Sequence, residues 1–251
     1  MITRVLDFLP AAEKYVFVCR KEHVDSSHID EVIKKTHPNA VFHAIDYLTE
    51  GQASTCLLGE EYCDPEKPLL IAACDNGMLY ADFDAYIAEH PEYDSLMWTF
   101  RRYESLRTNP KAWGWVKVKP NSIEVEDLSI KIPVSEDPFN DHAVVATFWF
   151  KRAGDFFDAA RLMIEKDIRI NGEFYADTIP LALNMMGKKT GIFEIDKYIG
   201  WGTPMDLRRY NYYKCMYENR PIEGDVEGIE FNEETREYYK GIFDGIKERG
   251  L

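Results

Sequence analysis

Apolar and polar positions follow two different periods in the first part of the chain. Short runs rich in β-branched and aromatic residues predict strands over 14–20, 40–45 and 69–74. Segments with helical spacing separate these runs, and we expect helices near 29–36 and 81–90. Strands that alternate with helices in this way are typical of a mainly parallel sheet with helices on both faces.

The pattern changes in the middle of the chain. Four strand-like runs follow one another, SLMWTF, AWGWVKVKP, SIEVEDLSIKIP and HAVVATFWF, with turn residues between them. The later elements that we expect are helices over 154–166 and 175–186, a strand over 190–195, and helices from Pro204 onward with a loop over 219–228. The sequence therefore predicts one α/β domain with a β-rich insertion.

Composition and charge narrow the classes of function. The 251 residues carry a net charge of −14, which disfavours nucleic acid or an anionic membrane as a partner because both need a basic surface. No apolar run is long enough to span a membrane, and no signal peptide is recognisable. Five cysteines without a CxxC pair indicate free thiols in a reducing compartment. We therefore expect a cytoplasmic protein that binds an anionic ligand only with the help of a cation or of local Lys and Arg.

The apolar run PLLIAACDNGMLY, residues 68–80, is interrupted at Asp75. A carboxylate at the carboxyl end of a central strand can hold Mg²⁺, which binds one or two carboxylates together with phosphate oxygens. Mg²⁺ would also connect an acidic protein to an anionic nucleotide. The alternative is an ordinary turn, because Asp followed by Asn-Gly is common turn chemistry. The sequence alone leaves both interpretations open.

Three further segments have residue types that suit ligand binding, and each has a structural alternative. In EGQAST (50–55), Gly51 and the following helix start could accommodate a phosphate or a base, or could supply only an N-cap. Lys131, isolated in the apolar run SIKIPV, could bind a phosphate or could protect an edge strand. Glu173 and Asp177, four residues apart, could stabilise a helix N-terminus, or Glu173 could bind ligand hydroxyls.

In this order, the segments resemble the sugar-phosphate nucleotidyltransferases, also called nucleotide-sugar pyrophosphorylases. MITRVLDFLP is similar to the helix after that family's first loop, YVFVCRKEH to its second strand, and EGQAST to the turn beside the nucleotide base. LLIAACDNGMLYADF resembles the strand and aspartate that bind Mg²⁺, WGWVKV the segment whose glycine backs the sugar, and SIKIP the Glu-Lys-Pro region at the sugar phosphate. NGEFYADTIPLAL and WGTPMDL resemble the closing glutamate-bearing helix and the Gly-Thr-Pro turn.

The resemblance implies a glycosyltransferase-A-like, Rossmann-related three-layer α/β fold with a mixed, mainly parallel central sheet and a β-rich insertion. Within the single domain 1–251, it implies a nucleotide-binding part (1–94), an acceptor-binding part (95–210) and a C-terminal helical segment (211–251). The implied reaction joins an NTP to a sugar 1-phosphate or a similar phosphomonoester and releases pyrophosphate. The partners are then an NTP or nucleotide sugar and a phosphorylated small molecule.

The resemblance also implies roles for particular residues. Asp75 would bind the nucleotide through Mg²⁺, the implied cofactor, and Asp196 is the candidate second ligand because Gly200 stands where the family has its second aspartate. The remaining implied contacts are Gly51, Gln52 and Ala53 at the nucleotide, Lys131 as the catalytic residue at the acceptor phosphate, and Gly114 and Glu173 at the acceptor group.

The sequence departs from the family pattern in two further ways. The family's Gly-rich loop, which ends in Arg, precedes a Pro-Lys pair and cradles the triphosphate, has no counterpart, and neither has the central strand that leads into it. We therefore expect either a gap between the strands 14–20 and 69–74 or direct pairing of the two. In addition, Ile130 stands where the family has an acidic residue.

Three functions stay open on the sequence. The first is an active nucleotidyltransferase. The second is a non-catalytic domain that binds a nucleotide sugar or regulates another protein. The third is a metal-dependent glycosyltransferase, because that fold also places an aspartate after a central strand.

Overall fold

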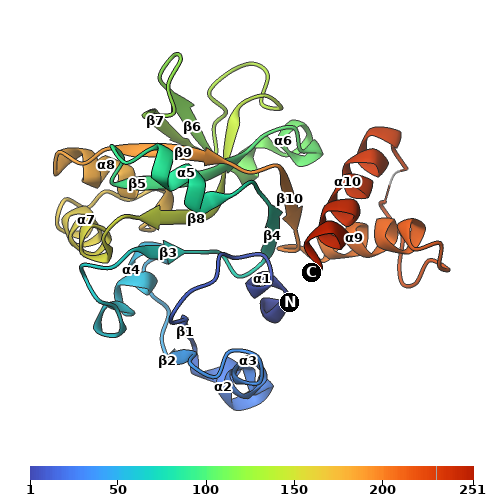
Figure 1. Ribbon diagram of the computed structural model, residues 1–251, viewed down its shortest axis with the longest axis horizontal. Coiled ribbons are helices and arrows are strands. Elements are labelled where there is room, and N and C mark those ends of the chain that lie inside the picture. The colour runs from blue at the N-terminus through green and yellow to red at the C-terminus, as the bar shows by residue number, and fades with distance from the viewer. Residues whose placement is uncertain (230) are drawn as a thin grey trace.

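A mixed six-stranded sheet forms the centre of the computed structural model, which describes residues 1–229 and 231–251 (Figure 1). Five strands follow the order β7-β6-β8-β5-β9, and β3 also pairs with β8. The strands are β3 Leu69–Ile71, β5 Ser95–Phe100, β6 Gly114–Val118, β7 Val125–Ile130, β8 His142–Phe150 and β9 Thr190–Glu194. The four runs predicted in the middle of the chain supply β5, β6, β7 and β8, so the β-rich part is confirmed.

The long strand β8 organises the sheet. It runs antiparallel to β3, β5 and β6, whereas β5 and β9 are parallel to each other. Consequently β3, β5, β6 and β9 share one direction, and β7 and β8 run the opposite way. The predicted mixed sheet is confirmed, with most strands in one direction although most neighbouring pairs are antiparallel.

Helices cover both faces of the sheet, as expected for three layers. One face packs against α4 (Gln52–Leu57), α7 (Ala153–Glu165) and α8 (Ile179–Met185), and the other against α5 (Phe83–Glu89) and α6 (Glu104–Thr108). Side chains of β5 show the period of two: Met97 joins the first core, while its neighbours Leu96 and Trp98 join the second.

A second, smaller unit joins the C-terminal helices to the sheet. The strands β4 (Asn76–Leu79) and β10 (Lys197–Gly200) pair antiparallel, and neither was predicted as a separate strand. The helices α9 (Pro204–Tyr217) and α10 (Glu233–Arg249) pack with α1 (Ile2–Leu6) on this pair, which confirms the helical C-terminus. None of the helices in the described residues is long and apolar enough to cross a membrane.

The first predicted strands form a sheet of their own. The strand β1 (Val16–Arg20) pairs in parallel with β2 (Val41–Ile45), beside the short helices α2 (Lys21–Ser27) and α3 (Ile29–Lys34). Within residues 1–229 and 231–251, β1 pairs with no other strand and β3 pairs only with β8. Of the two arrangements expected for a missing central strand, the structure has the gap.

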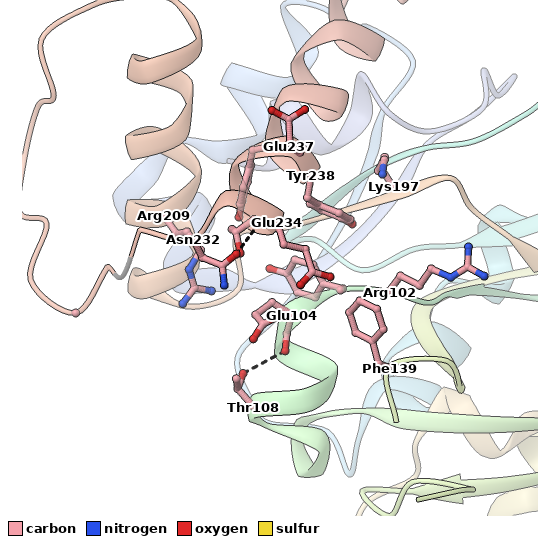
Figure 2. Close-up of a pocket in the computed structure, with 14 residues that line it drawn as sticks. Arg102, Glu104, Thr108, Phe139, Lys197, Arg209, Asn232, Glu234, Glu237 and Tyr238 are labelled. Atoms are coloured by element: carbon pink, nitrogen blue, oxygen red, sulfur yellow. Dashed lines mark hydrogen bonds between the residues drawn. The ribbon is translucent and has the colours of Figure 1, made fainter. Parts of the chain in front are cut away.

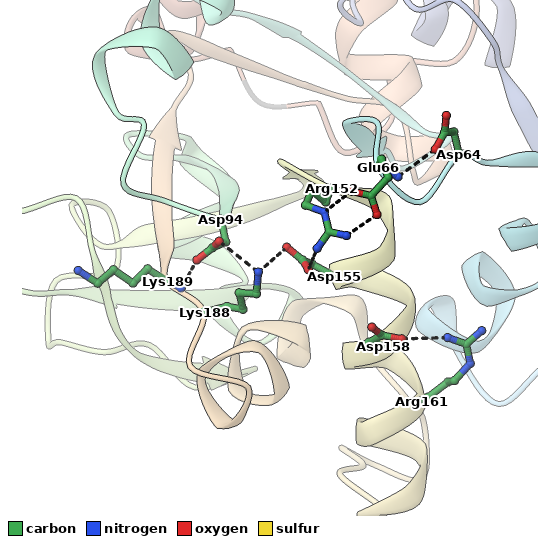
Figure 3. A network of polar contacts seen from close by, with 9 residues as sticks. All are labelled: Asp64, Glu66, Asp94, Arg152, Asp155, Asp158, Arg161, Lys188 and Lys189. Atoms are coloured by element: carbon green, nitrogen blue, oxygen red, sulfur yellow. Dashed lines mark hydrogen bonds and ion pairs between the residues drawn. The ribbon is translucent and has the colours of Figure 1, made fainter.

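Ion pairs close the end of the sheet where β3, β5 and β9 begin (Figure 3). Asp155, at the start of α7, is 4% exposed and accepts from Lys188 at 3.0 Å and from Arg152 at 3.3 Å. Arg152 also pairs with Glu66, and Lys188 lies 3.5 Å from Asp94. These contacts connect the segments before β3, β5 and β9 to the segment after β8.

Candidate functional site

Asp75 lies where the chain passes from one sheet to another. The strand β3 ends at Ile71, and the next strand, β4, begins at Asn76. Asn76 is 2% exposed and donates from Nδ2 to the Val145 carbonyl at 2.9 Å, while the Asp75 carbonyl accepts from the Trp201 N–H at 2.9 Å. The Asp-Asn-Gly sequence therefore enters a buried strand and does not form the turn that was the alternative.

The Asp75 carboxylate is half-buried and has no cationic partner among the described residues. Burial raises its pKa, and the charge of nearby Asp206 raises it further. A Cβ atom on Gly202 would lie 2.6 Å from Asp75 Oδ2, so this close approach requires glycine. An uncompensated carboxylate in this position has the donor chemistry that a bound Mg²⁺ requires.

The second carboxylate beside Asp75 is Asp206, and the structure does not bring Asp196 to this place. In the β4–β10 pair, Gly200 lies opposite Asn76 and Lys197 lies opposite Leu79. Asp196 is therefore at the far end of that pair from Asp75. Asp206 lies in the first turn of α9, and its Oδ2 accepts from Thr203 Oγ1 at 2.7 Å.

Among the described residues, few metal-binding side chains lie near Asp75. No three His, Cys, Asp or Glu side chains gather into a metal cluster in residues 1–229 and 231–251. One or two carboxylates match the usual protein contribution to a Mg²⁺ site, in which waters and phosphate oxygens complete the coordination. Asp75 and Asp206 thus fit a Mg²⁺ that binds together with an anionic ligand.

The segment around Gly51 packs directly against the segment around Phe174. Gly51 has φ 128°, and a Cβ there would lie 2.6–2.9 Å from the backbone atoms of Phe174. The Phe174 N–H donates to the Glu50 carbonyl at 2.7 Å, and the Ala53 N–H donates to the Phe174 carbonyl at 3.1 Å. Ala53 is fully buried, so of the three residues predicted at the nucleotide it faces the core, whereas Gln52 is half-buried.

The predicted acceptor residues are close to Asp177. A Cβ on Gly114 would overlap the Asp177 carboxylate, and the Lys131 N–H donates to the carbonyl of Trp113, next to Gly114. Lys131 has φ 66° and an exposed side chain, and Glu173 is exposed four residues before Asp177. Burial raises the pKa of Asp177 to about 6.

The sequence predicts Asp177 only as a helix-dipole residue and not as part of the site. In the structure it lies in the single 3₁₀ turn η3 (Ala176–Thr178), and Glu173 lies before this turn. The signal that could have identified Asp177 is Gly114, because a glycine in a strand often marks a close approach of another group.

Both groups of residues meet at one edge of β8. Asn76, next to Asp75, bonds to Val145, and a Cβ on Gly114 would lie 3.4 Å from the Val144 side chain. Ala146, which follows Val145, has φ 59°. The register of the β5–β8 pair shifts beside it, between Met97 and Thr99. Bulges of this kind are frequent beside active sites because they re-aim side chains. The candidate site therefore lies between the end of β3 and the start of β6.

No protein-family model matches the sequence, and a search of curated proteins finds no significant match. Solved structures do match the fold. The nucleoside-diphosphate-sugar pyrophosphorylase from Vibrio cholerae RC9 is 19% identical, with a TM-score of 0.64 and coverage of 82% of each chain.

Two further structures have the same fold. The inositol-1-phosphate CTP transferase from T. maritima is 13% identical, with a TM-score of 0.57, covering 78% of this chain and 73% of its own. A protein assigned as a glucose-1-phosphate thymidylyltransferase from Bacillus anthracis, in complex with a sucrose, is 14% identical. Its TM-score is 0.56, and the match covers 84% of this chain and 77% of the other. The chain therefore has the mixed α/β fold that these nucleotidyltransferase structures share.

Proposed function

We propose that the protein is a nucleotidyltransferase that transfers a nucleoside monophosphate from an NTP to a phosphorylated small molecule, such as a sugar 1-phosphate. In this reaction an acceptor phosphate oxygen bonds to the α-phosphorus, the bond from that phosphorus to the bridging oxygen breaks, and pyrophosphate leaves. The observation that carries the proposal is the half-buried, uncompensated Asp75 carboxylate at the exit of β3. The shared fold of three nucleotidyltransferase structures supports it.

The residues would act by positioning and by balancing charge. Asp75, with Asp206 in place of Asp196, would hold the Mg²⁺. When bound, the ion neutralises the phosphates of the nucleotide and of the acceptor. Lys131, which is exposed and forms no ion pair with a described residue, would bind the acceptor phosphate.

Gly51 and Gln52 would border the nucleotide base, and Gly114 and Glu173 the acceptor group. The 173–177 segment connects these two parts, because it contacts Gly51 at one end and Gly114 at the other. The acceptor and the base would therefore bind on either side of one rigid segment.

The test is nucleotide binding by calorimetry with CTP, UTP and dTTP, with and without Mg²⁺, for the unmodified protein and three variants. Asp75→Asn keeps the size of the side chain and removes the charge, so Mg²⁺-dependent affinity should fall by about tenfold or more. Asp196→Asn is the matched control and should change affinity less than about twofold, whereas Asp206→Asn should have an intermediate effect. Equal affinity of Asp75→Asn and the unmodified protein would exclude the metal-binding role.

Turnover separates this proposal from the other two functions. Release of pyrophosphate from an NTP and a sugar 1-phosphate, reduced in Lys131→Gln, is the expected result. Transfer from a nucleotide sugar without any dependence on pyrophosphate would indicate a glycosyltransferase.

Binding of a nucleotide sugar without turnover would indicate a non-catalytic domain.

A further inference from the structure

A cavity of about 510 Å³ lies between the C-terminal helices and the sheet (Figure 2). Its walls come from the residues after β5, from α6, from the start of β10 and from the first turns of α10. None of the residues assigned to the nucleotide or acceptor lines it. The volume is within the range of small-molecule sites. We propose that this cavity is a second binding site, for a small organic anion that carries a ring.

Three cations line the cavity, and two of them have no ion-pair partner. Arg209 lies 3.8 Å from Asp206, so the cavity borders the Asp75–Asp206 carboxylates. Arg102 and Lys197 form no ion pair with any residue in 1–229 or 231–251. The Lys197 ammonium lies 4.6 Å from the centre of the Tyr238 ring. Burial lowers the pKa of Lys197, which is the direction expected for a cation that lacks a partner in a poorly hydrated place. In Figure 2, Arg102 and Lys197 lie on one side of the view and Arg209 on the other.

Cations outside the cavity contact its three carboxylates. Glu104 and Glu234 share Arg107, at 3.6 and 3.3 Å, and Glu237 lies 4.0 Å from Lys240. Two lining cations have no partner, whereas two carboxylates share one, so the charge left for a ligand is positive even though the whole protein carries a net charge of −14.

Aromatic rings make the other contacts. Tyr103, Phe139 and Tyr238 line the cavity, and Phe139 is held under the Arg107 guanidinium, 3.3 Å from its ring centre. The buried hydroxyls of Tyr103 and Tyr239 lie close to each other, and that of Tyr103 lies close to Arg209, but neither makes a hydrogen bond of normal geometry to the described residues. Buried polar groups without partners are costly, so a ligand oxygen or a bridging water here would be favourable. Rings with nearby hydroxyls favour a flat ligand with polar substituents.

The test uses phenyl phosphate as the probe, titrated by calorimetry into the full chain. Inorganic phosphate supplies only the anion and benzyl alcohol only the ring. Benzoate keeps the ring and replaces the phosphate by a carboxylate. We expect phenyl phosphate to bind at least about tenfold more tightly than either half alone, because charge and ring contacts are made together. Benzoate binding with similar affinity would show that the site accepts any ring-bearing anion, and weaker binding would restrict it to phosphates.

Variants locate the binding. Arg102→Gln and Lys197→Gln should each weaken phenyl phosphate binding by about tenfold. Lys247→Gln, an exposed residue on the same helix as Glu237 but outside the cavity, is the matched control and should change affinity less than about twofold. Arg102 is exposed, so its variant should fold even if Lys197→Gln does not.

The result can be distinguished from the proposed nucleotidyltransferase site. Asp75→Asn and Lys131→Gln should leave phenyl phosphate binding unchanged. The proposal is wrong if phenyl phosphate does not bind, if only Lys131→Gln weakens it, or if Lys247→Gln weakens it as much as Lys197→Gln.

Discussion

The carboxylates before β3 and those after it differ in whether they have a cationic partner. Before β3, Glu66 pairs with Arg152, which also contacts the buried Asp155, so the buried carboxylate there has a cationic partner. After β3, Asp75 is a carboxylate whose pKa is raised because no cation offsets its burial, and the same holds for Asp177 beside Gly114 at the start of β6. The first arrangement stabilises the fold. The second costs stability, and such a cost is typical of positions retained for function.

The largest effect on stability should come from removing Asp155, the buried carboxylate in the ion pairs at the start of β3. Asp155→Ala leaves Lys188 and Arg152 without their shared, 4%-exposed partner. We expect the free energy of unfolding to fall by about 2–3 kcal/mol, at the lower limit for a buried pair because Lys188 is partly exposed. Urea denaturation measures this change. A loss below about 0.5 kcal/mol would mean that this end is no more important than the exposed surface.

Removing the charge of Asp177 should stabilise the protein, whereas removing Asp155 should destabilise it. The pKa of Asp177 is about 6 in the folded protein, above its usual 3.8, so the folded state holds the proton more tightly than the unfolded state. Stability from this group is therefore present at low pH and is lost as the pH rises from about 4 to 6, by on the order of 1–3 kcal/mol. Asp177→Asn should abolish that loss.

Thermal unfolding at about pH 4.5 and pH 7.5 tests this expectation, with the exposed Asp158→Asn as the matched control. The Asp177→Asn variant should be more stable than the unmodified protein at the higher pH and similar to it at the lower. Equal pH dependence of the two would show that Asp177 is not desolvated in the folded protein.

The smallest effect on stability should come from removing Arg161, whose ion pairs are exposed to solvent. Arg161 contacts Glu60 and Asp158, and its side chain is 50% exposed. Arg161→Ala should lower the free energy of unfolding by less than about 0.5 kcal/mol, because solvent screens such pairs. Arg152→Ala, which removes a partner of buried Asp155, should cost more in the same urea experiment. Equal losses would show that burial of Asp155 is not what distinguishes the network.

The sequence predicted the elements whose pattern is local. The strands of the β-rich middle and the helices α5 and α7 were found because their hydrophobic periods are complete within each segment. The strands β4 and β10 were not found. Each has only four residues. The Asn-Gly pair in β4 and the glycine that ends β10 are typical of turns, so the sequence alone predicts a loop.

The site was predicted at the level of segments and not of single side chains. The family resemblance implied Asp196 as the partner of Asp75, but the β4–β10 register, a long-range property, places Asp196 at the far end of the strand pair, and Asp206 of α9 lies near Asp75 instead. In the same way, EGQAST was chosen for its glycine, yet Ala53 turned out to face the core. Which residue of a segment faces outward depends on packing partners that are distant in sequence.

The separation of β1 and β2 from the main sheet also divides the molecule into units that open at different cost. All residues of β1 are only partly buried, whereas every residue of β5 is buried within the six-stranded ladder. Breaking β1 from β2 disturbs no hydrogen bond of that ladder. The amides of the N-terminal unit should therefore exchange with solvent through local opening, while those of β5 and β8 exchange only when the whole core unfolds.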